Sequence, residues 1–157
     1  MYAGQGKLGV MAYNRKNRAD YETEFHLQNE TDVIERICNH IGADYKKIPF
    51  TYRMDFAVHK LVTKKIWFFL EVKVRTFEMN RYKTSFVNLD KATAARDLTR
   101  NTGMPCYLAV QWKDRLGTID FNEQFTVEYG GRFDRGDSQD DGIVAHYDVD
   151  KFTILNI

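Results

Sequence analysis

The segment Ile66–Phe77 constrains the fold of this chain more than any other part of the sequence. It begins with the apolar run Ile66–Leu70 and continues with Glu71, Val72 and Lys73. Side chains alternate between the two faces of a β-strand. A strand here therefore has one wholly apolar face, and an opposite face on which Glu71 and Lys73 are neighbours.

A second acidic residue lies in the preceding predicted strand, Thr51–His59, where Asp55 stands between two apolar residues. The segment His59–Lys65 turns the two strands into a hairpin, and antiparallel pairing would bring Asp55 beside Glu71. A carboxylate pair with an adjacent ammonium, set inside apolar strands, is costly unless the charges pair or hold a cation. This cluster is therefore the strongest candidate for a functional site.

The composition is that of a globular domain. The chain has 157 residues, of which 43% are hydrophobic and 29% charged, so one domain with its own core is expected. The longest fully apolar run is far too short to span a bilayer, and the N-terminus has no long apolar segment. Cys38 and Cys106 lie in apolar segments, as buried thiols of a reducing compartment do. We expect a cytoplasmic protein without a membrane contact.

The net charge of +1 conceals an uneven distribution. Residues 1–100 contain 18 Lys and Arg against 12 Asp and Glu, whereas residues 101–157 contain 5 against 10. A basic front portion suits an anionic partner such as nucleic acid. An ordinary solvated surface would give the same pattern, so charge alone leaves both interpretations open.

Periodicity predicts two helices among several strands. The helices are expected over Asn29–Ile41 and Asn88–Asn101, each closed by a glycine, Gly42 and Gly103. Strands are expected over Tyr45–Phe50, Thr51–His59, Ile66–Phe77, Cys106–Trp112, Thr118–Phe121, Phe125–Tyr129, Ile143–Tyr147 and Phe152–Ile157. This order predicts an α/β domain with a mixed central sheet flanked by helices. Residues 1–20 are interpreted as a flexible basic arm and residues 122–157 as a C-terminal β extension of the same single domain.

The spacing of the charged residues resembles a known family. Asp55, followed 16 residues later by Glu71-Val72-Lys73 on an apolar strand, looks like the motif of the PD-(D/E)xK nuclease superfamily. The resemblance covers about residues 30–121, and the stretch from Glu71 to Val110 is similar to the small stand-alone nucleases common in bacteriophages. It implies the restriction-endonuclease-like fold. One departure is that Met54 stands where the motif has proline.

The resemblance also assigns roles to one residue on each helix. Family members often carry a glutamate on the first helix, about three turns before a glycine, that completes the metal site; Glu30 and Gly42 match this pattern. Glu30 would otherwise be a first-turn acid favoured by the helix dipole. On the second helix Lys91 shares a face with apolar residues and would point to the site, or would be a lysine that extends its ammonium to solvent.

The chemistry that the resemblance implies is metal-assisted phosphodiester hydrolysis. Asp55, Glu71, the main-chain carbonyl of Val72 and Glu30 would bind Mg²⁺ or Mn²⁺, which prefer oxygen ligands. Lys73 would orient or help deprotonate the attacking water and stabilise negative charge. Four residues at the end of the active strand and just beyond it would contact the nucleic acid, or would form a solvated connector: Arg75, Arg81, Tyr82 and Lys83.

These observations predict a metal-dependent endonuclease that acts on nucleic acid, more readily DNA than RNA, in a bacterial or phage-infected cell. Cleavage would be directed by DNA structure or be weakly sequence-specific, because no recognition domain is evident, and two copies could pair as a homodimer. Two alternatives remain open at this point. One is a non-catalytic nucleic-acid-binding or assembly module with the same fold, and the other is an ion-pair-rich structural domain.

Overall fold

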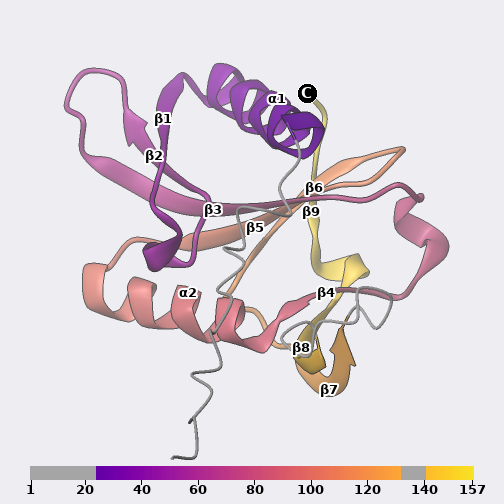
Figure 1. The fold of residues 1–157 in the computed structure, drawn as a ribbon. Coiled ribbons are helices and arrows are strands. Elements are labelled where there is room, and N and C mark those ends of the chain that lie inside the picture. Colours follow the sequence, from indigo (N-terminus) through magenta and orange to yellow (C-terminus); the bar gives the residue numbers. More distant parts are fainter. Residues whose placement is uncertain (1–23, 132–140) are drawn as a thin grey trace, which may run out of the picture.

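The computed structural model describes residues 24–131 and 141–157 (Figure 1). The predicted basic arm, residues 1–20, lies outside the described residues, as do residues 134–140 of a stretch, 134–142, that is rich in aspartate. Two helices enclose a central sheet: α1 (Glu24–Ile41) lies over one face and α2 (Leu89–Thr102) over the other (Figure 1).

The central sheet is mixed, as the sequence predicts. Its six strands follow the order β1-β2-β3-β5-β6-β9. β3 and β5 are parallel neighbours, and every other pair in this sheet is antiparallel. The strands are β1 (Ala43–Lys47), β2 (Phe56–Lys60), β3 (Ile66–Val74), β5 (Cys106–Gln111), β6 (Leu116–Asp120) and β9 (Thr153–Leu155).

A second, three-stranded sheet has the order β4-β8-β7. It consists of β4 (Thr84–Asn88), β7 (Thr126–Gly131) and β8 (Asp141–Asp148). β4 was not predicted, because the segment after Ile66–Phe77 reads as a connector. Residues 84–88 form a strand because they pair with β8, which lies more than fifty residues further along the chain.

Each face of β3 packs on a different core, as period-two alternation requires. Leu70 and Val72 join the cluster under α1, which includes Val33 and Ile34. The opposite face packs toward α2, where Ala92 and Ala95 are fully buried against β5 and the second sheet. Burial on both sides explains why β3 can hold charged residues away from water only if they find partners.

Several predicted boundaries were wrong by a few residues. α1 begins at Glu24, five residues before the predicted start, and β3 ends at Val74 instead of Phe77. The predicted strand Tyr45–Phe50 is β1, which ends at Lys47. α1 ends at Ile41, as predicted, and α2 ends at Thr102, one residue beyond the prediction. The predicted closing glycines, Gly42 and Gly103, adopt the left-handed conformation, with φ of 66° and 72°.

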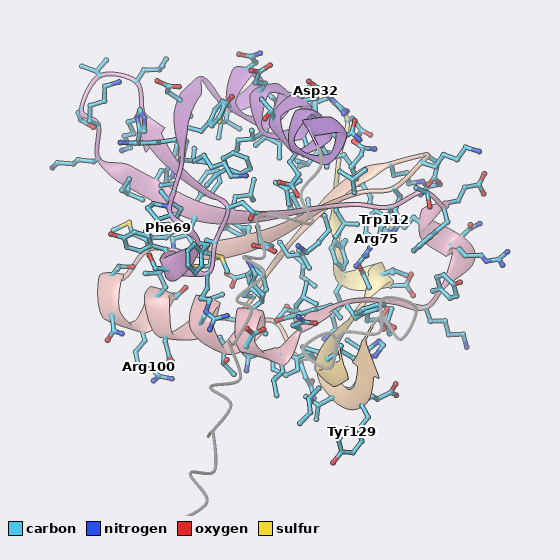
Figure 2. The ribbon with its side chains drawn as sticks, in the orientation of Figure 1. Asp32, Phe69, Arg75, Arg100, Trp112 and Tyr129 are labelled. Atoms are coloured by element: carbon cyan, nitrogen blue, oxygen red, sulfur yellow. The ribbon has the colours of Figure 1, made fainter. Side chains whose placement is uncertain are left out.

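The side chains of the described residues fill the two cores on either side of the central sheet (Figure 2). Cys38 and Cys106 are buried free thiols, as predicted. Within residues 24–131 and 141–157, no helix is long and apolar enough to cross a membrane.

Candidate active site

Asp55 lies at the end of a loop, immediately before β2, and contacts β3 through its main chain and its side chain. Its N–H donates to the Leu70 carbonyl (3.0 Å), and its Oδ2 accepts the N–H of Val72 (2.8 Å). Since Phe56 pairs with Leu70 in the antiparallel register, Asp55 comes next to Glu71. The sequence therefore predicted the neighbourhood, but the predicted strand from Thr51 was wrong because β2 starts only at Phe56.

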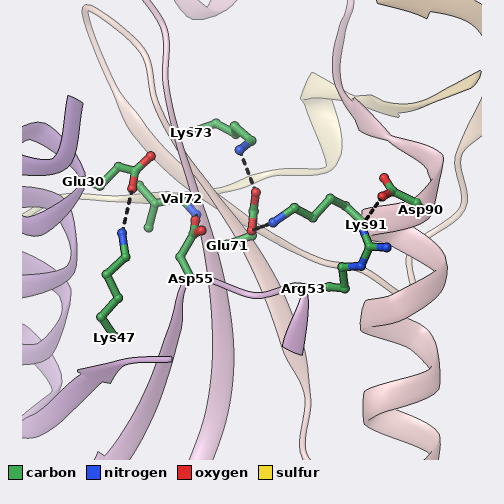
Figure 3. Close-up of polar contacts among 9 residues, drawn as sticks. All are labelled: Glu30, Lys47, Arg53, Asp55, Glu71, Val72, Lys73, Asp90 and Lys91. Carbon is green, nitrogen blue, oxygen red and sulfur yellow. Dashed lines mark hydrogen bonds and ion pairs between the residues drawn. The ribbon is translucent and has the colours of Figure 1, made fainter. Parts of the chain in front are cut away.

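Glu71 is a fully buried carboxylate with an ammonium on each oxygen. Lys73 Nζ lies 2.6 Å from its Oε1, and Lys91 Nζ lies 2.7 Å from its Oε2 (Figure 3). Burial favours the protonated form of Glu71, but the two ammonium groups outweigh burial and lower its pKa. Glu71 is thus ionised at neutral pH.

Lys73 and Lys91 come from different elements and reach Glu71 from two sides (Figure 3). The side chain of Lys73 on β3 is 34% exposed, whereas that of Lys91 on α2 is 15% exposed. Burial disfavours the ammonium of Lys73, but the charges of Glu71 and Asp55 outweigh burial and raise its pKa. Lys73 is therefore a protonated group that remains open to solvent on one side.

The pKa of Asp55 is shifted in the opposite direction from the pKa of Glu71. Burial, followed by the negative charge of Glu71, raises its pKa from 3.8 to about 6, against the opposing effect of Lys73, Lys91 and the Val72 N–H. The two carboxylates are therefore close enough to repel each other. Such repulsion is what a shared cation would relieve.

Glu30 approaches the same region from α1. Its Oε2 lies 3.9 Å from Lys47 Nζ on β1, and its side chain is 17% exposed (Figure 3). The negative charge of Glu30 also contributes to the raised pKa of Lys73. The apolar stripe of α1 thus turns Glu30 toward the sheet, whereas Glu35 is exposed and bonds the Tyr45 hydroxyl.

The four predicted nucleic-acid contacts lie on the connection from β3 to β4 and differ in their surroundings. Arg75 donates to the Phe86 carbonyl (2.9 Å) and lies over the Phe86 ring, so it ties β3 to β4. The guanidinium of Arg81 lies over the Tyr82 ring, which is 55% exposed. Lys83 is exposed beside them.

Comparison with known families identifies the chain. The model of the family described as "Phage putative PDDEXK endonuclease" matches residues 16–155, which is most of the sequence. This chain belongs to the phage PDDEXK endonuclease family. The predicted membership of the PD-(D/E)xK nucleases is therefore confirmed, and with it the assignment to nucleases.

A solved structure confirms the fold of this family member. It is that of Hjc from Archaeoglobus fulgidus, a Holliday junction resolvase from an archaeal hyperthermophile. The match has a TM-score of 0.54 at 10% sequence identity and covers 82% of this chain and 90% of that chain. The fold is thus restriction-endonuclease-like, as predicted. The search of curated proteins found no match.

Sequence reasoning missed an ion pair between the loop before β2 and the start of α2. Arg53 NH1 lies 2.6 Å from Asp90 Oδ2, and Asp90 precedes Lys91 on α2 (Figure 3). Arg53 is in the left-handed conformation, with φ of 63°. No periodicity marks these two residues, because neither lies on a buried face; their only sequence signal is that they neighbour Asp55 and Lys91.

The donor atoms at the centre of this site fit a hard divalent cation. Asp55 and Glu71 offer carboxylate oxygens, which Mg²⁺ and Mn²⁺ prefer. Among the described residues, no three His, Cys, Asp or Glu side chains already converge on one point. Both oxygens of Glu71 are held by lysines, so a cation bound there would replace at least one ammonium contact.

Proposed function

We propose that this family member is a metal-dependent endonuclease that hydrolyses phosphodiester bonds in DNA. The observation that carries the proposal is the group of two carboxylates and two ammonium ions on β3, α2 and the loop before β2. Charged neighbours within this group shift the pKa values of Asp55, Glu71 and Lys73, inside otherwise apolar elements. A purely structural ion pair would not need a second carboxylate whose ionised form is destabilised there.

In this proposal Asp55, Glu71 and the main-chain carbonyl of Val72 hold Mg²⁺ or Mn²⁺, and Glu30 completes the site from α1. The bound ion supplies Lewis acidity at the scissile phosphate and lowers the pKa of a water. The hydrogen bond from the Val72 N–H fixes the orientation of the Asp55 carboxylate. This restraint supports Asp55 as a preorganised ligand.

Lys73 and Lys91 have different roles in the proposal. The raised pKa and the partial exposure of Lys73 support an ammonium that orients the attacking water and neutralises charge developing on the phosphate. This protonation state argues against Lys73 as the base in the metal-free protein. Lys91 is the more buried cation and positions Glu71 by its 2.7 Å contact.

The substrate is proposed to be DNA rather than RNA, recognised mainly through its backbone. Arg75, Arg81 and Lys83 would meet phosphates, and Tyr82 would stack on a base or a ribose. The basic balance of residues 1–100 supports an anionic partner. The resolvase activity named for the Archaeoglobus neighbour makes branched DNA one substrate to test, and a homodimer would supply two sites for two strands. The cytoplasm of a bacterial or phage-infected cell is the expected place of action.

The proposal is tested by incubating the full chain with supercoiled, linear, single-stranded and branched DNA in Mg²⁺, Mn²⁺ or chelator. Wild type should cleave at least one substrate only when the metal is present, and Glu71→Gln should abolish cleavage. Asp97→Asn removes an exposed carboxylate on α2 and should leave cleavage unchanged. Metal-independent DNA binding without cleavage would instead favour the non-catalytic module, and cleavage in chelator would contradict the metal.

A further inference from the structure

The loop that precedes Asp55 presents two aromatic rings to solvent. We call residues 48–55 the aromatic loop; its ends meet where the Ile48 N–H donates to the Asp55 carbonyl (3.0 Å). Phe50 is 80% exposed and Tyr52 is 54% exposed. The next aromatic residue, Phe56, is by contrast almost fully buried against the Tyr45 ring. Two large rings exposed two residues apart on one loop can serve as flat contact surfaces for a ligand.

The aromatic loop is held in one conformation by several contacts. A short 3-10 turn covers Phe50–Tyr52 and places the Tyr52 N–H on the Pro49 carbonyl, at 3.0 Å. Arg53 then adopts the left-handed conformation, with φ of 63°, which is strained for a non-glycine residue. The 2.6 Å contact of Arg53 with Asp90 offsets this strain. These hydrogen bonds and the Arg53–Asp90 ion pair therefore order the loop that carries the two rings.

The aromatic loop is connected to the proposed active site at both Asp55 and α2. Tyr52 is three residues before Asp55, so their Cα atoms are at most about 11 Å apart. Asp90, which anchors Arg53, is followed by Lys91, which bonds Glu71. The exposed rings and the proposed metal ligand Asp55 therefore belong to one short stretch of backbone, and a nucleic acid bound at Asp55 and Glu71 would lie near this loop.

The charge around the rings indicates which partner fits them. Residues 46–53 contain three basic residues and no acidic residue. Lys47 and Arg53 pair with Glu30 and Asp90, but their side chains remain 46% and 49% exposed, so both can still meet an anionic ligand. Two copies that paired through this loop about a twofold axis would bring like charges together. Nucleic acid fits this surface better, because its phosphates would bind the basic side chains and its bases would stack on the rings.

We propose that Phe50 and Tyr52 form a base-stacking element that directs this protein to DNA with an interrupted base stack. This inference rests on the proposed function, because it takes the scissile phosphate to lie at Asp55 and Glu71. In a continuous duplex both faces of each base are covered by neighbours, and contact with a ring then requires unstacking of the base. A branch point, a nick or a single strand offers an uncovered face without this cost.

The experiment compares DNA of one sequence as a continuous duplex, a nicked duplex, a single strand and a four-way branch. Affinity is measured in Ca²⁺ and cleavage in Mg²⁺ or Mn²⁺, with the full chain. The variants are Phe50→Ala, Tyr52→Ala and the double variant, and the ring-preserving pair is Phe50→Tyr and Tyr52→Phe. Tyr129→Ala is the matched control, because Tyr129 is 91% exposed on β7 of the second sheet.

Wild type should bind the three interrupted DNAs more tightly than the duplex. Removal of one stacked ring should weaken binding to interrupted DNA by about 5- to 100-fold, with less than a twofold effect on the duplex. The ring-preserving variants and Tyr129→Ala should stay within twofold of wild type on every DNA. Thermal unfolding of each variant shows that the loss does not come from misfolding.

Three results would overturn the inference. Equal losses on all four DNAs would make the rings a general contact, and an unchanged DNA preference in the double variant would remove them from recognition. A dimer that dissociates in the double variant, without a change in preference, would assign the loop to contact between copies. Failure of the proposed function looks different: wild type would cleave no DNA, while binding in Ca²⁺ could still depend on both rings.

Discussion

Replacement of Asp55 by asparagine should stabilise the metal-free protein at neutral pH. Burial and the charge of Glu71 raise the pKa of Asp55 from 3.8 to about 6, so ionised Asp55 disfavours folding, by an amount that grows from about pH 4 and is complete above about pH 6. Asparagine removes the charge, and its carbonyl oxygen can still accept the Val72 N–H that Asp55 accepts at 2.8 Å. The variant thus separates the electrostatic penalty from the hydrogen bond.

The magnitude follows from proton linkage. A raised acid pKa means that the native state holds its proton more tightly, so stability falls as pH rises from about 4 to about 6. The penalty of ionised Asp55 reaches about 3 kcal/mol at pH 7.5 and only about 1 kcal/mol at pH 4.5. Because Asp55 is only partly buried, solvent screening lowers the neutral-pH gain to about 1–3 kcal/mol.

Urea denaturation of chelator-treated protein at pH 4.5 and pH 7.5 measures this gain. The stability difference between Asp55→Asn and wild type should be larger at pH 7.5, and Mn²⁺ should stabilise wild type but not the variant. Asp97→Asn, at an exposed carboxylate, should change stability by less than about 0.5 kcal/mol at both pH values. A difference that shrinks with rising pH, or a destabilised Asp55→Asn at pH 7.5, would refute the reasoning.

Three further changes follow from the same structure. Lys91→Met leaves Glu71 with one of its two ammonium partners and should lower the urea-unfolding free energy by about 1–3 kcal/mol. Replacing Arg75, Arg81 and Lys83 together by alanine should weaken the salt dependence of DNA affinity, measured in Ca²⁺. The slope of log affinity against log salt should become shallower by up to about three units, roughly 0.9 per lost phosphate contact. An unchanged slope would show that the DNA binds elsewhere. Gly103→Ala puts a side chain at φ of 72°, and thermal unfolding should show a loss of about 1 kcal/mol.

The central strand and its charged face could be predicted because the determining pattern is local. Period-two alternation over Ile66–Val74 fixes which side chains share a face, and a hairpin brings Asp55 to the same place. Helical periodicity likewise predicted that Glu30 and Lys91 lie on the helix faces that pack toward the sheet. Each of these inferences needs only the residues of one element, or of two strands joined by a short turn, and the geometry of the backbone.

The features that the sequence did not predict depend on contacts between distant residues. Asp55 precedes its strand because Arg53 adopts a left-handed conformation, and the partner that stabilises Arg53 is Asp90, 37 residues away. Asparagine and glycine favour this conformation and arginine does not, so no local preference indicates a turn there. The loop that carries Phe50 and Tyr52 therefore could not be recognised as ordered before the fold was known.

The second sheet also belongs to the site, although none of its strands carries a residue of the charged cluster. β4 ends at Asn88 and α2 begins at Leu89, so the position of β4 sets where α2 starts. β4 is paired with β8 along its whole length, from Thr84 with Asp148 to Asn88 with Val144. Lys91 lies in the first turn of α2 and reaches Glu71 only if this start is fixed. The C-terminal strands thus act on the proposed active site by positioning Lys91, and a substitution that loosens β4 from β8 would release one of the two cations that keep Glu71 ionised.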